Sequence, residues 1–332
     1  MKIKARKDLL KIILGVLCVI LLVVGVALIL NAWEDNHYTN DNSLSSANSN
    51  DSTGDIEYNG TWYKLNKNID TVLLVGVDKY LASTDSDTYI NSQQSDFLML
   101  MIIDTESESY RVLHINRDIM TDVNMLGVTG DVIGTVYEQI ALAHTYGSGE
   151  EDSAENTVDA VSNLLYGVDV DHYITITMDA VSIINDAVGG VTVTALDTIN
   201  DDIVEGETVT LLGENALLYV RTRMGLEDST NLHRMERQKQ YLEALFEQFN
   251  KKLDEDSSFF LSVALDISQY MVSDCSVNEL SSLFNTMSDY ELIDYLTIEG
   301  ESILGEEFIE CYVDEDALYE LYLELFYVPI ED

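Results

Sequence analysis

The hydrophobic pattern begins with one long apolar run near the start of the chain. Residues Ile12–Leu30 contain no charged side chain, and Leu, Ile and Val dominate them. A helix of this length spans roughly 28 Å at about 1.5 Å per residue, close to the ~30 Å core of a bilayer. A core helix this long would carry a polar face, and a signal peptide has a shorter apolar stretch followed by a cleavage site. The pattern therefore predicts a transmembrane helix over residues 12–31.

The distribution of basic residues orients this predicted helix. Five basic residues precede it, and none follows until Lys64; the five are Lys2, Lys4, Arg6, Lys7 and Lys11. The positive-inside rule places residues 1–11 in the cytoplasm and the rest of the chain outside. Residues 32–57 are rich in Asn, Ser, Asp and Thr, so we expect an extracytoplasmic linker there.

Beyond the linker, short apolar segments alternate with longer amphipathic ones. Two of the short segments flank the polar turn Asp104–Ser109, which indicates a hairpin. Strands are predicted at Tyr58–Leu65, Ile69–Val77, Phe97–Ile103, Tyr110–Ile115, His172–Met178 and Val191–Thr194. Helices are predicted at Val132–Tyr146, Ala154–Leu165, Ala180–Val188 and Leu232–Lys252.

This alternation predicts an α/β fold, an α-β-α sandwich around a mixed central sheet. The main domain is expected over residues 58–252. Residues 253–332 are predicted to form an acidic helical extension packed on the same domain. Within that extension, residues 257–289 and Asp314–Phe326 are the expected helices.

Composition limits the partners that the chain can have. The formal net charge is −43, which keeps an outer domain soluble and argues against nucleic acid, itself a polyanion. Cys18 lies in the predicted membrane helix, whereas Cys275 and Cys311 either form a disulfide or remain free thiols; the spacing does not decide. No Cys and His spacing of the kind found in zinc sites is present.

The arginines of the outer part are concentrated in two places. Beyond the predicted helix there are six arginines, and Arg111 lies outside the two segments. The first segment is Asn116–Asp118 and contains Arg117. The second runs from Arg221 to Gln238 and contains Arg221, Arg223, Arg234 and Arg237. Arginine binds phosphate with a planar, permanently charged fork. On a helix Arg234, Arg237, Gln238 and Tyr241 share one face, and an extended backbone would align Arg221 with Arg223. Five arginines in so acidic a chain favour a phosphate site over ordinary surface pairing with neighbouring glutamates.

Two carboxylates accompany these arginines at predicted strand ends. Asp78 directly follows the strand Ile69–Val77, and Asp96 directly precedes the strand that begins at Phe97. Ligand groups in α/β folds lie at strand ends. These positions suit Mg²⁺, which proteins bind with one or two carboxylates while ligand phosphates complete its coordination shell.

Five ordered sequence blocks resemble one known family. They are NIDTVLLVGVDK, QSDFLMLMIID, VLHINRDI, YGVDVDHYITITMDAVSIINDAVGGVTV and LLGENALLYVRTR…HRMERQ. Together they resemble the LytR–CpsA–Psr family of cell-wall enzymes over about residues 66–252. The resemblance implies transfer of an anionic glycopolymer, such as a teichoic acid or capsular polysaccharide, from a polyprenyl-pyrophosphate lipid to peptidoglycan. It places the activity on the outer face of the cell membrane, in a bacterium of Gram-positive type.

The resemblance also implies roles for individual residues. Asp78 and Asp96 match the Mg²⁺ ligands. The pyrophosphate-binding set corresponds to Arg117, Arg221, Arg223, Arg234, Arg237 and Gln238. Asp118 either orients Arg117 or helps to deprotonate the acceptor. The segments Val132–Tyr146 and Ala180–Val188 are expected to wall a polyprenyl pocket.

The chain departs from the family pattern at three positions. Asn116 replaces a proline, Gln94 replaces an arginine, and Asn231 replaces an aspartate three residues before Arg234. Asp228 lies nearby and is the expected substitute for that carboxylate, which makes it a candidate catalytic residue with Arg117, Asp118, Arg221 and Arg223. Besides transfer, two functions stay open: a non-catalytic polyprenyl-pyrophosphate scaffold or regulator, and hydrolysis of the pyrophosphate lipid by water.

Overall fold

The computed structural model describes residues 55–77, 93–222, 232–256, 259–275, 290–305 and 308–330. Within those ranges no helix is both long and apolar enough to cross a membrane. The predicted membrane helix at 12–31, the tail at 1–11 and all but the end of the linker lie outside the described residues. So do Asp78, Arg223, Asp228 and Asn231.

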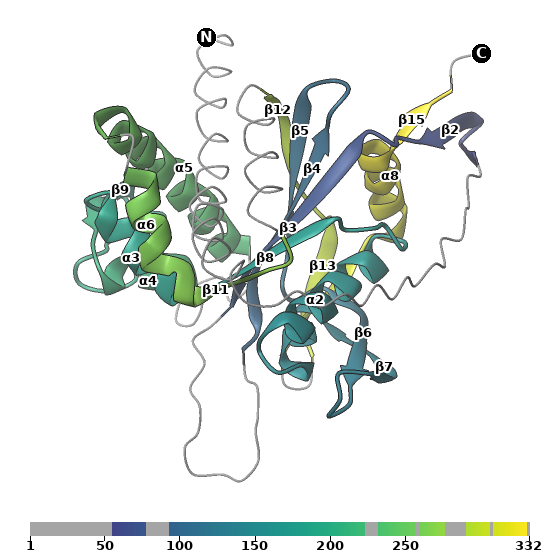
Figure 1. Ribbon diagram of the computed structural model, residues 1–332, viewed down its shortest axis with the longest axis horizontal. Helices are drawn as coiled ribbons and strands as arrows, with labels where there is room; N and C mark the ends of the chain where they lie inside the picture. Colours follow the sequence, from purple (N-terminus) through teal and green to yellow (C-terminus); the bar gives the residue numbers. More distant parts are fainter. Residues whose placement is uncertain are drawn as a thin grey trace, which may run out of the picture.

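A six-stranded mixed sheet forms the centre of the molecule (Figure 1). Its order is β11 (Met271–Ser273), β8 (His172–Thr177), β3 (Ile69–Val77), β4 (Ser95–Asp104), β5 (Ser109–Ile115) and β12 (Glu291–Thr297). The β3–β8 and β5–β12 pairs are parallel, and the other neighbours are antiparallel. The predicted strands at β3, β4, β5 and β8 and the predicted hairpin are confirmed.

Each strand sends alternate side chains to two separate hydrophobic cores. Val72 and Leu74 of β3 belong to one core, and Leu73 and Val75 belong to the other, as the two-residue period of a strand requires. The first core is covered by α3 (Asp179–Ala187), α4 (Glu214–Arg221), α5 (Leu232–Glu255) and α6 (Phe259–Ile267). The second is covered by α2 (Glu151–Leu164) and α8 (Glu315–Phe326). Figure 1 shows these helices on opposite sides of the sheet, which confirms the predicted α-β-α sandwich.

Smaller sheets surround the central one. The strands β1 (Ile56–Tyr58), β2 (Thr61–Leu65) and β15 (Tyr327–Pro329) form one sheet. The other three are hairpins: β6 (Met120–Leu126) with β7 (Val132–Gln139), β9 (Val191–Thr194) with β10 (Thr208–Leu211), and β13 (Gly300–Leu304) with β14 (Ile309–Val313). The predicted single strand Tyr58–Leu65 is therefore a hairpin, because Asn59 and Gly60 adopt positive φ angles of 50° and 80° and turn the chain.

The helix predicted over Val132–Tyr146 is wrong in its first half. Val132–Gln139 forms β7 and pairs with β6, and only Ile140–Tyr146 is helical, as the 3-10 helix η1. Four of the first five residues after Asp131 are β-branched, a composition that favours a strand once a partner strand is available.

The extension predicted as helical over residues 253–332 contains strands as well as helices. It contains α6, the 3-10 helix η2 (Ser268–Tyr270) and α8, but also the five strands β11 to β15. Two of these, β11 and β12, are the edge strands of the central sheet. The last part of the chain therefore completes the domain. The predicted helix Asp314–Phe326 is confirmed, with the Asp314 carboxylate accepting from the backbone N–H groups of Asp316 and Ala317.

Candidate functional site

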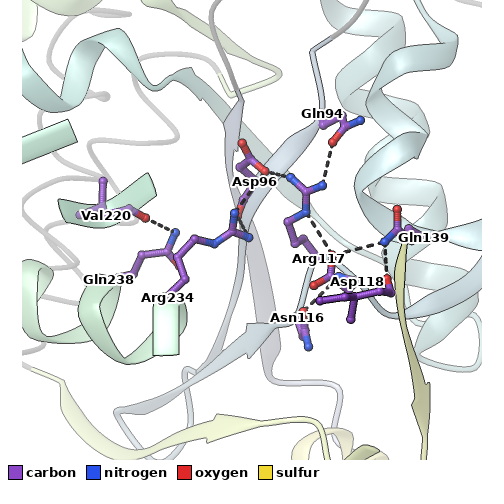
Figure 2. Close-up of polar contacts among 10 residues, drawn as sticks. Gln94, Asp96, Asn116, Arg117, Asp118, Gln139, Val220, Arg234 and Gln238 are labelled. Atoms are coloured by element: carbon purple, nitrogen blue, oxygen red, sulfur yellow. Dashed lines mark hydrogen bonds and ion pairs between the residues drawn. The ribbon is translucent and has the colours of Figure 1, made fainter. Parts of the chain in front are cut away.

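The site lies at the edge of the sheet where β4 begins and β5 ends. Leu98 pairs with Ile115, so continuing the antiparallel register places Asp96 opposite Arg117. The Arg117 guanidinium forms an ion pair with Asp96 and donates to Gln94 Oε1 at 2.7 Å (Figure 2). Asp96 and Arg117 are each less than a tenth exposed to solvent. Gln94, which replaces an arginine of the family pattern, thus holds Arg117 in place.

A second arginine reaches the same carboxylate from the helical layer. Arg234, in the first turn of α5, contacts Asp96 Oδ1 at 3.5 Å and donates to the Asp96 carbonyl oxygen at 3.2 Å. Figure 2 shows Arg117 and Arg234 approaching Asp96 from opposite sides. The segments that carry the two arginines are more than a hundred residues apart in sequence, and one aspartate joins them.

Asp118 is fully buried and lies beside Arg117. Its Oδ1 lies 3.4 Å from Arg117 Nε and accepts from Gln139 Nε2 at 3.3 Å. Gln139 also donates to the Ile309 carbonyl at 2.6 Å, and the Asn116 side chain accepts from the Asp118 backbone N–H at 3.0 Å. These contacts orient Arg117, which was one of the two predicted roles of Asp118. Sequence reasoning missed Gln139 because it was assigned to a helix.

Arg237 lies one turn further along α5 in a different setting. It is fully buried, and its Nε donates to the Tyr219 carbonyl at 2.9 Å. Its two other nitrogens contact Asp197 and the Thr222 carbonyl. Asp197 has no sequence signal that marks it as a partner, because it lies forty residues away on a loop. The predicted shared face of Arg234, Arg237 and Gln238 is confirmed.

Arg221 occupies the last position of α4 and is exposed. The backbone is helical at this residue, so the extended conformation that would align Arg221 with Arg223 is not present at Arg221. Its neighbour Val220 accepts a hydrogen bond from Gln238 Nε2 at 3.1 Å, so the end of α4 is held against α5.

An apolar pocket of about 70 Å³ lies next to these side chains. Its walls come from α3, α4, α5 and the strands of the sheet: Leu74, Gly76, Phe97, Ile176, Met178, Val181, Ile184, Val220, Gln238, Tyr241, Leu242 and Leu245. Gln238 is the main polar group of the lining, since the Tyr241 hydroxyl donates to Asn185 at 3.1 Å. The pocket confirms that Ala180–Val188 borders an apolar space, whereas Val132–Tyr146 does not contribute to it.

Comparison with known proteins identifies the family of the chain. The family model LytR_cpsA_psr matches residues 32–324. The chain belongs to the LytR–CpsA–Psr family. The resemblance carried by the five sequence blocks is therefore confirmed, and the match extends well past residue 252 into the strands of the last part of the chain.

Two curated members of the LytR–CpsA–Psr family illustrate the likeness. A protein of Halalkalibacterium halodurans, named polyisoprenyl-teichoic acid–peptidoglycan teichoic acid transferase TagU, is 33% identical over 172 residues, which is 51% of this chain and 51% of that protein. The protein of that name from Enterococcus faecalis is 25% identical over 265 residues, 78% of this chain and 80% of the relative. The chain thus spans about half the length of the first relative.

Solved structures of the family share the fold. The structure described as TagT bound to LI-WTA has a TM-score of 0.55 at 23% identity, covering 78% of this chain and 90% of that one. Bacillus subtilis TagV has a TM-score of 0.56 at 24% identity, covering 78% and 96%. At these identities the likeness shows the fold alone.

The Mg²⁺ implied by the family resemblance can be tested against Asp96. This carboxylate is a hard oxygen donor at the edge of the sheet, and both arginines contact its Oδ1. Mg²⁺ is commonly bound by one or two carboxylates together with ligand phosphates. Asp96 therefore fits as one ligand, and Asp78, the other predicted ligand, lies outside the described residues.

Proposed function

We propose that this chain transfers an anionic glycopolymer from a polyprenyl-pyrophosphate carrier to peptidoglycan. The observation that carries the proposal is the juxtaposition of Arg117 and Arg234 with an apolar pocket. A lipid pyrophosphate has these two properties side by side, a concentrated negative charge joined to a hydrocarbon chain. The teichoic acid transferase names of the curated relatives point to the same class of reaction.

The arginines bind the pyrophosphate in this proposal. Arg117 and Arg234 flank the site, Arg221 approaches from the end of α4, and Arg223 completes the set. The hydrocarbon chain enters between α3 and α5. Typical ligand pockets enclose about 300–1,000 Å³, and this pocket encloses about 70 Å³, so its lining side chains must move apart to admit a prenyl unit.

The reaction is a phosphoryl transfer. A hydroxyl oxygen of peptidoglycan attacks the phosphorus that carries the glycopolymer, and the bond from that phosphorus to the bridging oxygen breaks. Polyprenyl monophosphate leaves, and the hydroxyl proton passes to a carboxylate, for which Asp228 is the candidate. Arginines that face the bridging oxygen neutralise the charge that develops there. Mg²⁺ bound by Asp96 and Asp78 would neutralise further charge on the departing phosphate.

The proposed location follows from the substrate. A polyprenyl carrier stays in the bilayer, so the enzyme must work at the membrane surface. The apolar run at residues 12–31 supplies the anchor, with residues 1–11 in the cytoplasm and the described domain outside. The linker at residues 32–57 gives the domain reach above the lipid headgroups.

A second function, binding without transfer, is favoured by Asn231. An amide there removes the carboxylate that the family pattern has three residues before Arg234. A scaffold or regulator would retain the arginines and the pocket, and would lack the base.

One experiment separates these functions. The full chain in detergent is incubated with a polyprenyl-pyrophosphate glycan, Mg²⁺ and peptidoglycan fragments. Glycan covalently joined to peptidoglycan is expected, with release of polyprenyl monophosphate in equal amount. Monophosphate without the joined product would establish hydrolysis, and retention of the intact lipid would establish binding alone.

A further inference from the structure

Three metal-ligating side chains meet where β8 begins and β11 ends, away from the site described above. The register pairs Met271 with Ile176 and Ser273 with Ile174. Continuing the antiparallel register places Cys275 opposite His172. Asp274 lies between the last paired residue of β11 and this cysteine.

The donor atoms of these residues converge. One nitrogen of His172, one carboxylate oxygen of Asp274 and the Cys275 sulfur all lie within 4.8 Å of one another. His172 Nδ1 is 3.5 Å from Asp274 Oδ2. Tetrahedral zinc with bonds of about 2.0–2.3 Å holds its ligand atoms roughly 3.3–3.8 Å apart, so a contraction of about 1 Å or less brings the three atoms to bonding geometry.

Neighbouring backbone groups already orient the carboxylate. The Tyr173 N–H donates to Asp274 Oδ1 at 2.8 Å, which leaves Oδ2 directed toward His172. Such hydrogen bonds to a ligand from outside the coordination sphere are a regular feature of protein metal sites. Cys275 is buried, and Asp274 is exposed and gives an ion access from solvent.

The electrostatic surroundings favour a cation. Asp70 and Asp171 interact with each other, and Asp70 also interacts with His172. Glu155 interacts with Asp274 and Glu151 from the side of α2. Among the described residues, no lysine or arginine contributes to the main electrostatic interactions of Asp70, Glu155 or Asp274.

We propose that His172, Asp274 and Cys275 bind a Zn²⁺ ion, with water in the fourth position. A thiolate, an imidazole and a carboxylate together suit zinc, whereas Mg²⁺ prefers oxygen ligands alone. Binding releases the thiol proton of Cys275 to solvent. His172 pairs with Val72, five residues before the end of β3 at Val77, which places the ion about 17 Å along the strands from the arginine site. The ion therefore fixes the edge strand β11 to β8 and takes no part in phosphoryl transfer.

The test uses the metal-free full chain in detergent, with excess Mg²⁺ to occupy oxygen sites. Titration with Co²⁺, a spectroscopic substitute for zinc, is expected to give thiolate-to-cobalt charge-transfer absorption and the visible bands of tetrahedral cobalt. One equivalent of Zn²⁺ should remove both signals. Zn²⁺ should also raise the melting temperature of the protein, since it binds the folded form.

Two cysteine variants make a matched pair, because Cys275 and Cys311 are both buried and neither forms a disulfide. Cys275→Ser should lose the charge-transfer absorption and the zinc-dependent rise in melting temperature. Cys311→Ser should keep both. His172→Gln should retain a thiolate signal and bind at least ~10-fold more weakly, as expected for loss of one ligand.

The proposal is overturned if the wild-type chain shows no charge-transfer absorption with Co²⁺. It is equally overturned if Cys311→Ser loses that absorption, or if Cys275→Ser, folded by circular dichroism, binds Zn²⁺ as tightly as wild type. Should Cys275→Ser not fold, the His172→Gln variant decides, since wild-type affinity in that variant contradicts the site.

Discussion

Two buried arginine–carboxylate clusters lie one helical turn apart on α5 and differ in what surrounds them. In the first, Arg234 and Arg117 share Asp96 beside an apolar pocket. In the second, Arg237 is enclosed by Asp197 and two backbone carbonyls. The α5 arginines of both clusters come from a single run of sequence, HRMERQ.

The difference separates anchoring from binding. The contacts of Arg237 join α5 to the end of α4 and to the Asp197 loop, so its charge is neutralised within the protein. In the first cluster Arg117 and Arg234 share Asp96, and Asp118 contacts Arg117 from the other side. This cluster lies beside the apolar pocket, whereas the Arg237 cluster is enclosed by protein groups. Arginines three positions apart in one motif thus serve different purposes, and substitutions can distinguish them.

The largest expected effect is on stability and concerns Arg237. Arg237→Ala should lower the free energy of unfolding by about 3–5 kcal/mol, because Asp197 loses its buried guanidinium partner and retains the contact with His233, and the Tyr219 and Thr222 carbonyls lose their donor. Urea denaturation of the full chain would measure this. Arg234→Ala should cost less, about 1–2 kcal/mol, since Asp96 keeps Arg117. Equal losses in the two variants would remove the distinction between the clusters.

The next effect is catalytic and concerns Arg117. Arg117→Ala should slow release of polyprenyl monophosphate by about 10²–10³-fold, the usual loss when one donor to developing negative charge is removed. The matched control is Arg111→Ala, a half-buried arginine of β5 outside the site. Wild-type turnover in Arg117→Ala would refute the site assignment.

A smaller effect concerns the pocket beside the first cluster. Val181→Phe narrows the space between α3 and α5 and should weaken binding of a polyprenyl pyrophosphate roughly 10-fold, or about 1.4 kcal/mol. Binding of a water-soluble sugar pyrophosphate without the lipid should be unchanged, which isothermal titration would show. Val158→Phe, a half-buried valine on the other face of the sheet, is the control. Equal weakening of both ligands would argue against a lipid site.

The smallest effect is a change in titration. Burial, with the positive charges of Arg234 and Lys239, lowers the pKa of His114 to about 3. The unfolded chain binds this proton near pH 6.5, so the contribution of His114 to stability is lost as the pH falls from 6.5 toward 3. Arg234→Ala should raise the pKa and increase protonation of His114 at pH 4, measured by NMR of its ring protons. An unchanged pKa of His114 would place Arg234 farther from the sheet than described. As a control, Arg111→Ala should leave the pKa of His114 unaltered.

Much of the fold could be predicted from local patterns, and the errors have one cause. Ile69–Val77 and Val191–Thr194 match their strands residue for residue, because an apolar run or a β-branched segment next to turn signals needs no distant information. Val132–Gln139 is amphipathic in a way that suits a helix or a strand, and only its pairing with β6 decides between them. The strands β11 and β12 pair with β8 and β5, about a hundred and a hundred and eighty residues earlier, and neither pairing is visible locally.

Local sequence patterns likewise predicted only part of the site. The helical spacing of Arg234, Arg237 and Gln238 predicted their shared face, and Asp96 was found from its place before a strand. The partners that distinguish the two clusters, Gln139 and Asp197, are polar residues of ordinary context, and only the folded arrangement brings them to the arginines. The roles of Asp78, Arg223 and Asp228 stay predictions.

The late completion of the central sheet has a kinetic consequence. The strands β8 and β5 receive their outer neighbours only from residues 271–273 and 291–297, and Tyr327 pairs with Leu65 across most of the domain. Pairings so distant in sequence slow folding, because the chain must close long loops first. A newly synthesised chain would therefore expose two open strand edges until its last quarter emerges, a state prone to aggregation. Truncation before β12 is accordingly expected to trap an aggregating intermediate and not to yield a smaller working domain.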